Sequence, residues 1–312
     1  AIFLQVGEEN RASEGMKTLQ DLGSPFSQIF VPGMEKQRYI GEAPKQVTPK
    51  QKGNRFSEIS DKARKVIDRL QKAPSYINQS KLAFVDALGD EAYLRLLGYR
   101  EVTDHMRATT NKVDLERIIG KNLSLTRGLA ESRVYAREAG DKPVFFEWFL
   151  SVTGRLQQKG PVTPQGDKIA RELISATNST LDLTNEAHQD ALWLAVAQSI
   201  GISIEKMTQD EAIEAASDLI TSETGLWPAV QIVQENLQGL PMDSAGFEIA
   251  INNAQDAKGE PLEVTAKLLH AVRVVAEANQ AMDTSAAKSF KTSLALEADG
   301  KTDGPINAMV HM

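Results

Sequence analysis

The stretch Ser293-Leu-Ala-Leu-Glu-Ala-Asp-Gly300 brings a short apolar strand to an end in one carboxylate and a glycine turn. Gly304-Pro305 and a new apolar segment follow it. A second stretch of this kind lies far upstream, where Leu150-Ser-Val-Thr-Gly154-Arg155 closes another apolar strand. Strands that end in turns hold functional side chains on a rigid scaffold. The two stretches therefore predict an active site built from two strand ends of one sheet.

Most of the remaining chain has helical periodicity. The apolar spacing and capping residues predict helices over 60–70, 78–88, 91–97, 113–139, 169–176, 187–200, 209–220, 229–237 and 262–278. Strands are predicted at 143–150, which is rich in aromatic residues, and at 293–298. This pattern predicts an α+β fold that is predominantly helical, in which a long helical block separates the two strands.

Composition limits the function classes. At 312 residues the chain is long enough for two subdomains. It contains no cysteine, which excludes disulfides and cysteine-ligated metals. The four histidines are dispersed and show no metal-ligand spacing. With no secretion signal and no membrane segment in this sequence, we expect a protein that works inside a cell.

The net charge of −7 conceals a strong asymmetry. Residues 32–72 carry 11 Lys and Arg against 5 Asp and Glu, and residues 111–171 carry 11 against 7. Residues 172–263 carry only 2 against 16, a balance of −14. A polyanion could bind the first two regions and would be repelled by the third, although any one charge run can also be just a solvated helix face.

Asp299 and Arg155 have chemistry that suits phosphate transfer, but each also has an ordinary interpretation. A carboxylate at a strand end, with the carbonyl of Gly300, could bind a hard dication such as Mg²⁺, whereas an Asp-Gly pair alone is more often a hairpin turn. Gly154 permits close backbone approach and Arg155 offers a planar fork for phosphate, yet such pairs are common.

A basic ridge is predicted on the helix over 113–139. Arg117 and Lys121 are four residues apart, as are Arg133 and Arg137, so each pair lies on one helix face. Such a ridge could contact a nucleic-acid backbone. The aromatic residues of the 143–150 strand, Trp193 and Trp227 are expected to be packing residues.

Taken together, these motifs resemble the single-subunit DNA-dependent RNA polymerases of bacteriophages and mitochondria. The stretch from Lys142 to Arg155, followed by Thr163-Pro-Gln-Gly166, is similar to the family's Gly-Arg motif and its downstream Asn-Pro-Gln-Gly. Leu296-Glu-Ala-Asp299-Gly300 with Gly304 resembles its palm motif A. Ser151 departs from the family's Asp or Thr. The acidic block makes the chain most similar to the virion-packaged polymerases of podophages.

The resemblance implies an irregular segment over 1–54, a thumb-like helical region over 55–141, and a palm over 142–312 with an acidic helical insertion at about 172–285. It implies that Asp299 and Arg155 are catalytic, that Asp299 and Gly300 bind metal, and that two Mg²⁺ ions act in the complete enzyme. Arg155, Gly154, Arg117 and Lys121 would contact nucleic acid.

The same resemblance implies a DNA template, nascent RNA and ribonucleoside triphosphates as partners, and a location in the virion and then in the host cytoplasm. Motifs B and C, with the second catalytic aspartate, would lie beyond Met312, on the same polypeptide or on a second subunit. Two alternatives stay open. One is a DNA polymerase of the same palm superfamily, and the other is a non-enzymatic helical ejection or scaffold protein of the virion.

Overall fold

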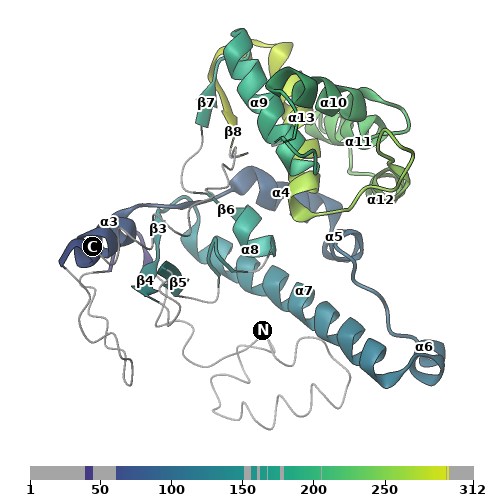
Figure 1. The fold of residues 1–312 in the computed structure, drawn as a ribbon, viewed down its shortest axis with the longest axis horizontal. Coiled ribbons are helices and arrows are strands. Elements are labelled where there is room, and N and C mark those ends of the chain that lie inside the picture. Colours follow the sequence, from purple (N-terminus) through teal and green to yellow (C-terminus); the bar gives the residue numbers. More distant parts are fainter. Residues whose placement is uncertain are drawn as a thin grey trace. The chain divides into compact units, whose positions relative to one another are not determined.

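The computed structural model describes residues 39–44, 61–150, 156–159, 162–166, 168–175, 179–204, 206–292 and 294. Helices predominate there and the strands are short, which confirms the predicted α+β, mainly helical class (Figure 1). The chain divides into two compact units. Unit 1 comprises 1–77, 109–177 and 299–312, and unit 2 comprises 78–108 and 178–298.

The described part of unit 1 combines helices with three antiparallel strand pairs. Its helices are α3 (Asp61–Lys72), α7 (Lys112–Ala139) and α8 (Lys168–Leu173). Its strands are β1 (Tyr39–Ile40), β2 (Tyr76–Ile77), β3 (Val144–Phe145), β4 (Glu147–Leu150), β5 (Leu156–Lys159) and β6 (Ile174–Ser175). The pairs are β1 with β3, β2 with β6, and β4 with β5.

Helix α7 is one unbroken helix of 28 residues, which confirms the predicted segment at 113–139. Asn111 caps its start, because the Asn111 side chain accepts a hydrogen bond from the N–H of Asp114 at 2.9 Å. Its buried residues all lie from Asn122 onward and include Leu129. Helix α8 packs against α7. Residues 112–121 of α7 have no buried side chain, and Leu115 is only half-buried there.

Tertiary pairing corrects two predictions in unit 1. The strand predicted at 143–150 is interrupted at the buried Phe146, because its first part pairs with β1 and its second part with β5. The helix predicted at 169–176 ends at Leu173, because the next two residues pair with β2. Ile174 lies opposite Ile77 there, and both are buried. Local periodicity cannot show partners that are distant in sequence.

The described part of unit 2 is a helical assembly with one strand pair. Its helices are α4 (Gln79–Leu88), α5 (Asp90–Leu96), α6 (Asp104–Thr109, at the unit boundary), α9 (Glu186–Ser199), α10 (Gln209–Thr221), α11 (Trp227–Leu237), α12 (Ser244–Asn253), α13 (Ala266–Met282) and the 3₁₀ turn η3 (Ser285–Ser289). Strand β7 (Ser179–Leu181) pairs with β8 (Phe290–Thr292).

Helix α13 forms the centre of unit 2. It is buried on most of its circumference and packs against α4, α9 and α11. It begins at Ala266 rather than at the predicted residue 262, because Thr265 caps it by accepting a hydrogen bond from the N–H of Leu268. Helix α12 was not predicted. Asp243 caps it and Phe247 is fully buried beneath it.

The strand predicted at 293–298 lies mostly outside the described residues. Strand β8 occupies Phe290–Thr292 just before it, and its partner β7 was not predicted. Of the predicted strand only Leu294 is described, and it is buried. The four sheets in the described residues have two strands each, and β8 is not paired with β4 or β5. The expectation of one shared sheet lies mostly outside the described residues.

The segment 78–108 packs with the helices of the predicted insertion. The rings of Phe84 on α4 and Phe247 on α12 meet edge to face with centroids 5.6 Å apart, and both side chains are fully buried. Arg95 on α5 forms a bidentate pair with Glu248 on α12, at 2.9 and 3.0 Å. This segment falls within the thumb-like region expected over 55–141, and in the structure it belongs to unit 2.

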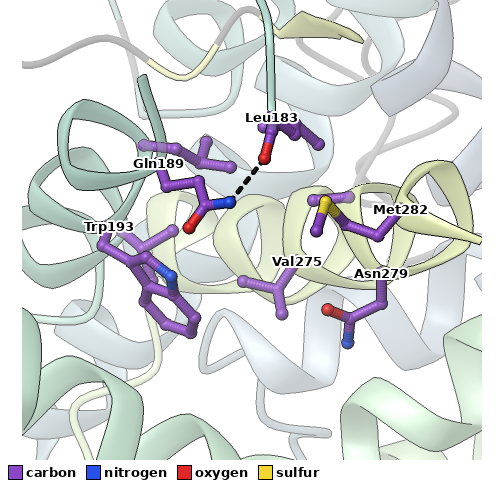
Figure 2. A pocket seen from close by; sticks show the side chains of 9 residues that line it. Leu183, Gln189, Trp193, Val275, Asn279 and Met282 are labelled. Carbon is purple, nitrogen blue, oxygen red and sulfur yellow. Dashed lines mark hydrogen bonds between the residues drawn. The ribbon is translucent and has the colours of Figure 1, made fainter. Parts of the chain in front are cut away.

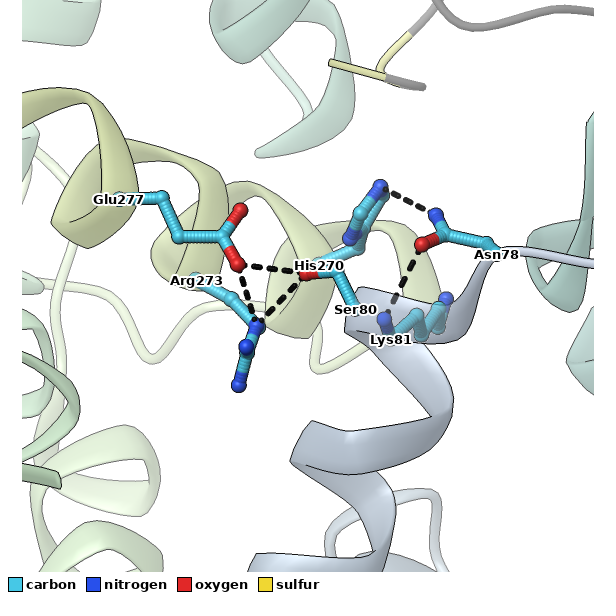
Figure 3. A network of polar contacts seen from close by, with 6 residues as sticks. All are labelled: Asn78, Ser80, Lys81, His270, Arg273 and Glu277. Atoms are coloured by element: carbon cyan, nitrogen blue, oxygen red, sulfur yellow. Dashed lines mark hydrogen bonds and ion pairs between the residues drawn. The ribbon is translucent and has the colours of Figure 1, made fainter. Parts of the chain in front are cut away.

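A polar network joins α4 to α13 (Figure 3). Nε of Arg273 donates to Oε1 of Glu277 at 2.8 Å and to Oγ of Ser80 at 3.0 Å, and Ser80 donates to Glu277 at 2.5 Å. The guanidinium also lies 5.6 Å from the ring centroid of Phe84. Lys81, only 1% exposed, donates to the carbonyl of Ala266 at 3.3 Å. Satisfied buried polar groups of this kind fix one packing arrangement.

His270 is buried in this network. Asn78 accepts from the N–H of Lys81 through its Oδ1, so its Nδ2 is the group that faces Nε2 of His270 at 3.4 Å. Burial lowers the pKa of His270 well below its ordinary value, and the positive charges of Lys81 and Arg273 lower it further. The protonated imidazole is therefore disfavoured in the folded state.

Unit 2 is expected to lose stability as the pH falls below about 6.5, where unfolded histidine gains its proton and the buried His270 does not. Above that pH His270 makes no pH-dependent contribution. Each such proton changes the free energy of unfolding by about 1.4 kcal/mol per pH unit until the folded pKa is reached. Thermal unfolding between pH 7.5 and 5.5 checks this. His270→Gln should flatten the dependence.

Candidate functional site

The predicted residues Gly154, Arg155, Asp299 and Gly300 lie outside the described residues, and the structure describes the frame around the first two. Strands β4 and β5 pair antiparallel, from Glu147 opposite Lys159 to Leu150 opposite Leu156. Gly154 and Arg155 fall between these two strands in sequence and lie outside the described residues. We call the β4–β5 pair the Gly-Arg hairpin.

The Gly-Arg hairpin is held on its β4 side by α3. Helix α3 packs against β4, and Gln71 on α3 is 1% exposed. Its Oε1 accepts a hydrogen bond from the N–H of Trp148 at 3.4 Å. Trp148 is half-buried, as expected for a packing residue.

The sequence Thr163-Pro-Gln-Gly166 predicts a type I or II turn, in which Gly166 would permit a positive φ. The structure confirms a tight turn here, beside β5. The N–H of Gly166 donates to the carbonyl of Thr163 at 2.8 Å, with Pro164 at the second position. The reason for the glycine differs from the expected positive φ. A Cβ on Gly166 would lie 3.0 Å from the Thr163 carbonyl oxygen, so the glycine allows a close approach.

Gln165 connects this turn to the Gly-Arg hairpin. The N–H of Gln158 on β5 donates to Oε1 of Gln165 at 2.7 Å, and the N–H of Gln165 donates back to Oε1 of Gln158 at 3.3 Å. Nε2 of Gln165 also approaches the carbonyl of Leu156, the residue after Arg155, at 3.5 Å. This role was not predicted, because a glutamine in a turn carries no signal for a specific backbone partner.

Replacing Gln165 with alanine is expected to loosen β5. Loss of one neutral hydrogen bond costs about 0.5–1.5 kcal/mol, so the amide of Gln158 should exchange its hydrogen roughly two- to tenfold faster. Hydrogen exchange followed by NMR measures this. Gln157→Ala, at the exposed neighbouring position on β5, is the matched control and should leave that rate unchanged. Equal rates in wild type and Gln165→Ala would show that the side chain does not brace the strand.

Arg117 and Lys121 lie on the amino-terminal half of α7, and both are exposed. The Arg117 side chain is 79% exposed and forms an ion pair with Asp114 at 3.1 Å. An ion pair this exposed contributes little to stability, so the guanidinium can exchange Asp114 for another anion. On the other half of the helix Arg133 is half-buried and Arg137 is exposed, so the predicted ridge is exposed at Arg117, Lys121 and Arg137.

Among the residues that the structure describes, no group of three or more histidine and acidic side chains could hold a metal ion. The metal prediction rests on Asp299 and Gly300, which are not among them. In the same residues, no helix is long and apolar enough to span a membrane.

Comparisons with known proteins match both units. A family described as the virion DNA-directed RNA polymerase domain matches residues 62–174, and the plug insertion of virion DNA-directed RNA polymerase matches residues 189–279. Both matches are parts of one class of enzyme and occur in order on this chain. The chain belongs to the family of virion-packaged phage RNA polymerases.

The virion DNA-directed RNA polymerase of Enterobacteria phage N4 is a relative with 29% identity over 248 residues. The alignment covers 76% of this chain and 7% of the relative. The chain thus spans a small part of the relative's length. The plug match at 189–279 falls inside the acidic insertion predicted at about 172–285.

Proposed function

We propose that this chain supplies part of the thumb and palm of a phage DNA-directed RNA polymerase, which transcribes a DNA template into RNA. The strongest support for this proposal is the family membership, which rests on two matches to different parts of the chain. The polymerase would be carried in the virion and would act in the host cytoplasm. Motifs B and C would come from the remainder of the polymerase, on the same polypeptide or on a second subunit.

Asp299 is proposed to bind metal in this reaction. Its carboxylate and the carbonyl of Gly300 are hard oxygen donors of the kind that Mg²⁺ prefers, so the donor set fits. Two bound Mg²⁺ ions would stabilise the attacking and leaving oxygens of the nucleotidyl transfer. Asp299 would contribute a negative charge. Its place at the end of a strand would hold that charge in a fixed position.

Arg155 is proposed to bind the template or the RNA–DNA hybrid near that site. Its guanidinium matches a phosphate with two parallel hydrogen bonds, and Gly154 would let a backbone approach. The bracing of β4 by Gln71 and of β5 by Gln165 supports this role, because both contacts restrain the strands on either side of residues 151–155. A restrained hairpin loses less entropy when it binds.

The amino-terminal half of α7 is proposed to contact nucleic-acid phosphates through Arg117 and Lys121. Replacing both with alanine in the complete polymerase should reduce the slope of log affinity against log salt by about 1.4–1.8, since each phosphate contact contributes about 0.7–0.9. Filter binding across a salt series measures this. The control is Lys206→Ala with Lys258→Ala in the acidic insertion, where the same charge is removed and no change in slope is expected.

The proposed function is tested with the complete polymerase on a single-stranded DNA template. We expect Mg²⁺-dependent incorporation of ribonucleotides in preference to deoxynucleotides. Preference for deoxynucleotides would favour a DNA polymerase of the same superfamily. A complete protein that incorporates neither would favour the non-enzymatic ejection or scaffold protein.

A further inference from the structure

A pocket of about 180 Å³ opens between α9 and α13 in unit 2 (Figure 2). Its walls are apolar and come from both helices: Leu192, Trp193 and Val196 on α9, and Val275, Ala278 and Met282 on α13. Trp193, expected to be a packing residue, therefore lines an opening instead of being enclosed in the core. The proposed catalytic chemistry makes no use of this pocket.

The volume indicates what the pocket can hold. An engineered apolar cavity of about 150 Å³ binds benzene, whereas sites for drug-sized ligands and cofactors measure about 300–1,000 Å³. At about 180 Å³ the pocket has room for one bulky apolar side chain and is too small for a nucleotide or a cofactor. A side chain that fills it would belong to a larger molecule.

The rim of the pocket is suited to a polypeptide. Met282 is 50% exposed, and methionine adapts its shape to different apolar partners. Gln189 and Asn279 also line the pocket and carry amides (Figure 2). Nε2 of Gln189 donates to the carbonyl of Leu183 at 2.5 Å, which fixes that side chain in place. Amide groups beside an apolar pocket can form hydrogen bonds with the backbone of a bound segment.

The charge around the pocket selects the kind of segment. Glu186 and Asp190 are exposed on α9, and Asp283 is exposed after α13. Helix α9 contains no lysine or arginine, and α13 contains none after Arg273. Lys288 on η3 interacts electrostatically with Asp182, so the negative charge of Asp182 offsets the positive charge of Lys288. The surroundings therefore attract cations and oppose phosphate or carboxylate ligands.

We propose that the α9–α13 pocket is a docking site for a basic segment of a partner protein, which inserts one leucine-sized side chain between flanking lysines or arginines. Burial of that side chain supplies the affinity, and Glu186, Asp190 and Asp283 supply the selectivity for basic segments. The site does not depend on polymerase activity.

The test uses the full chain and a short synthetic peptide with one leucine flanked by lysines. Binding is followed by NMR of ¹³C-methyl methionine, with the Met282 signal assigned from Met282→Leu. We expect a saturable shift of that signal with a dissociation constant below about 1 mM. Replacing the leucine of the peptide with serine should weaken binding about tenfold or more, since burying a leucine contributes about 1.5–3 kcal/mol. Replacing the flanking lysines of the peptide with glutamates should weaken binding by a comparable factor.

Variants of the chain locate the contact. Ala278→Phe fills the pocket and should abolish the shift. Met282→Lys, at a half-exposed position that does not require repacking, should weaken binding of the basic peptide even if Ala278→Phe unfolds. Glu186→Gln with Asp190→Asn should weaken binding severalfold at low salt and little at high salt. The matched control is Glu263→Gln, which also removes one negative charge. Glu263 precedes the amino-terminal end of α13, whereas Ala278 lies near the carboxyl-terminal end. At 1.5 Å per helical residue the two positions are about 20 Å apart.

Several results would overturn the proposal. Equal binding of the lysine-flanked and glutamate-flanked peptides would remove the charge selection. Binding that survives both Ala278→Phe and Met282→Lys would place the contact elsewhere. Self-association of the chain that Ala278→Phe abolishes, without peptide binding, would instead identify a second copy as the occupant. No binding of the basic peptide at millimolar concentration would also contradict the proposal.

Discussion

Asp299→Asn in the complete polymerase is expected to lower the rate of single-nucleotide extension by about a thousandfold or more. The substitution keeps the shape of the side chain and removes the negative charge that is proposed to bind Mg²⁺. A metal that supplies several kcal/mol of transition-state stabilisation, at about 1.4 kcal/mol per tenfold in rate, accounts for a loss of this size. Template affinity, carried by Lys and Arg contacts, should be unchanged. Rapid-quench extension assays and template binding measure the two quantities.

Asp303→Asn is the matched control for this prediction. Asp303 lies four residues after Asp299. Like Asp299, it is an aspartate that is followed directly by a glycine. Its substitution should change the extension rate by less than tenfold. If Asp299→Asn itself retains activity within tenfold of wild type, Asp299 is an ordinary turn residue. The metal proposal would then lose its main support.

Phe84→Ala is expected to destabilise unit 2 by about 3–5 kcal/mol, the usual cost of removing a buried phenylalanine. Phe84 is fully buried, meets the ring of Phe247 at 5.6 Å and lies beneath the guanidinium of Arg273. For a unit of this size the melting temperature should fall by about 10 °C. Hydrogen exchange should speed up in α12 and α13 although the substitution lies in α4, because the segment 78–108 is part of their core.

Ile249→Ala provides the comparison for Phe84→Ala. Ile249 is a large apolar residue on α12 but is 62% exposed, so its removal leaves no cavity and should cost well under 1 kcal/mol. A Phe84→Ala chain that melts within 2 °C of wild type, with unchanged exchange in α12 and α13, would show that segment 78–108 does not contribute to the stability of the insertion helices.

The sequence predicted the helices whose signals are local. Helices α7, α9 and α10 begin and end within one or two residues of their predicted bounds, because cap residues such as Asn111 and Thr208 and an amphipathic period act within a few residues. The turn at Thr163–Gly166 was predicted for the same reason. The motif residues Arg155 and Asp299 also came from sequence alone, and their roles stay predictions.

Only the tertiary structure revealed the features that depend on distant partners. The pairing of β2 with β6 shortened α8, and the pairing of β7 with β8 added two strands that were not predicted. The docking of α4 and α5 on α12 and α13 joined two segments that are separate in sequence. Such contacts depend on apolar burial between residues roughly 100–200 positions apart, and burial is non-directional, so no local pattern encodes its partner.

The same distinction between local signals and contacts with distant residues applies to the candidate site. The sequence by itself determined which residue types are available: a carboxylate beside a glycine at 299–300, a Gly-Arg pair at 154–155, and an acidic block. The tertiary structure alone decided that Gln71 and Gln165 brace the hairpin and that Trp193 lines an open pocket. Hydrogen bonds and pockets require atoms within a few ångströms of one another, and only the folded chain brings those atoms together.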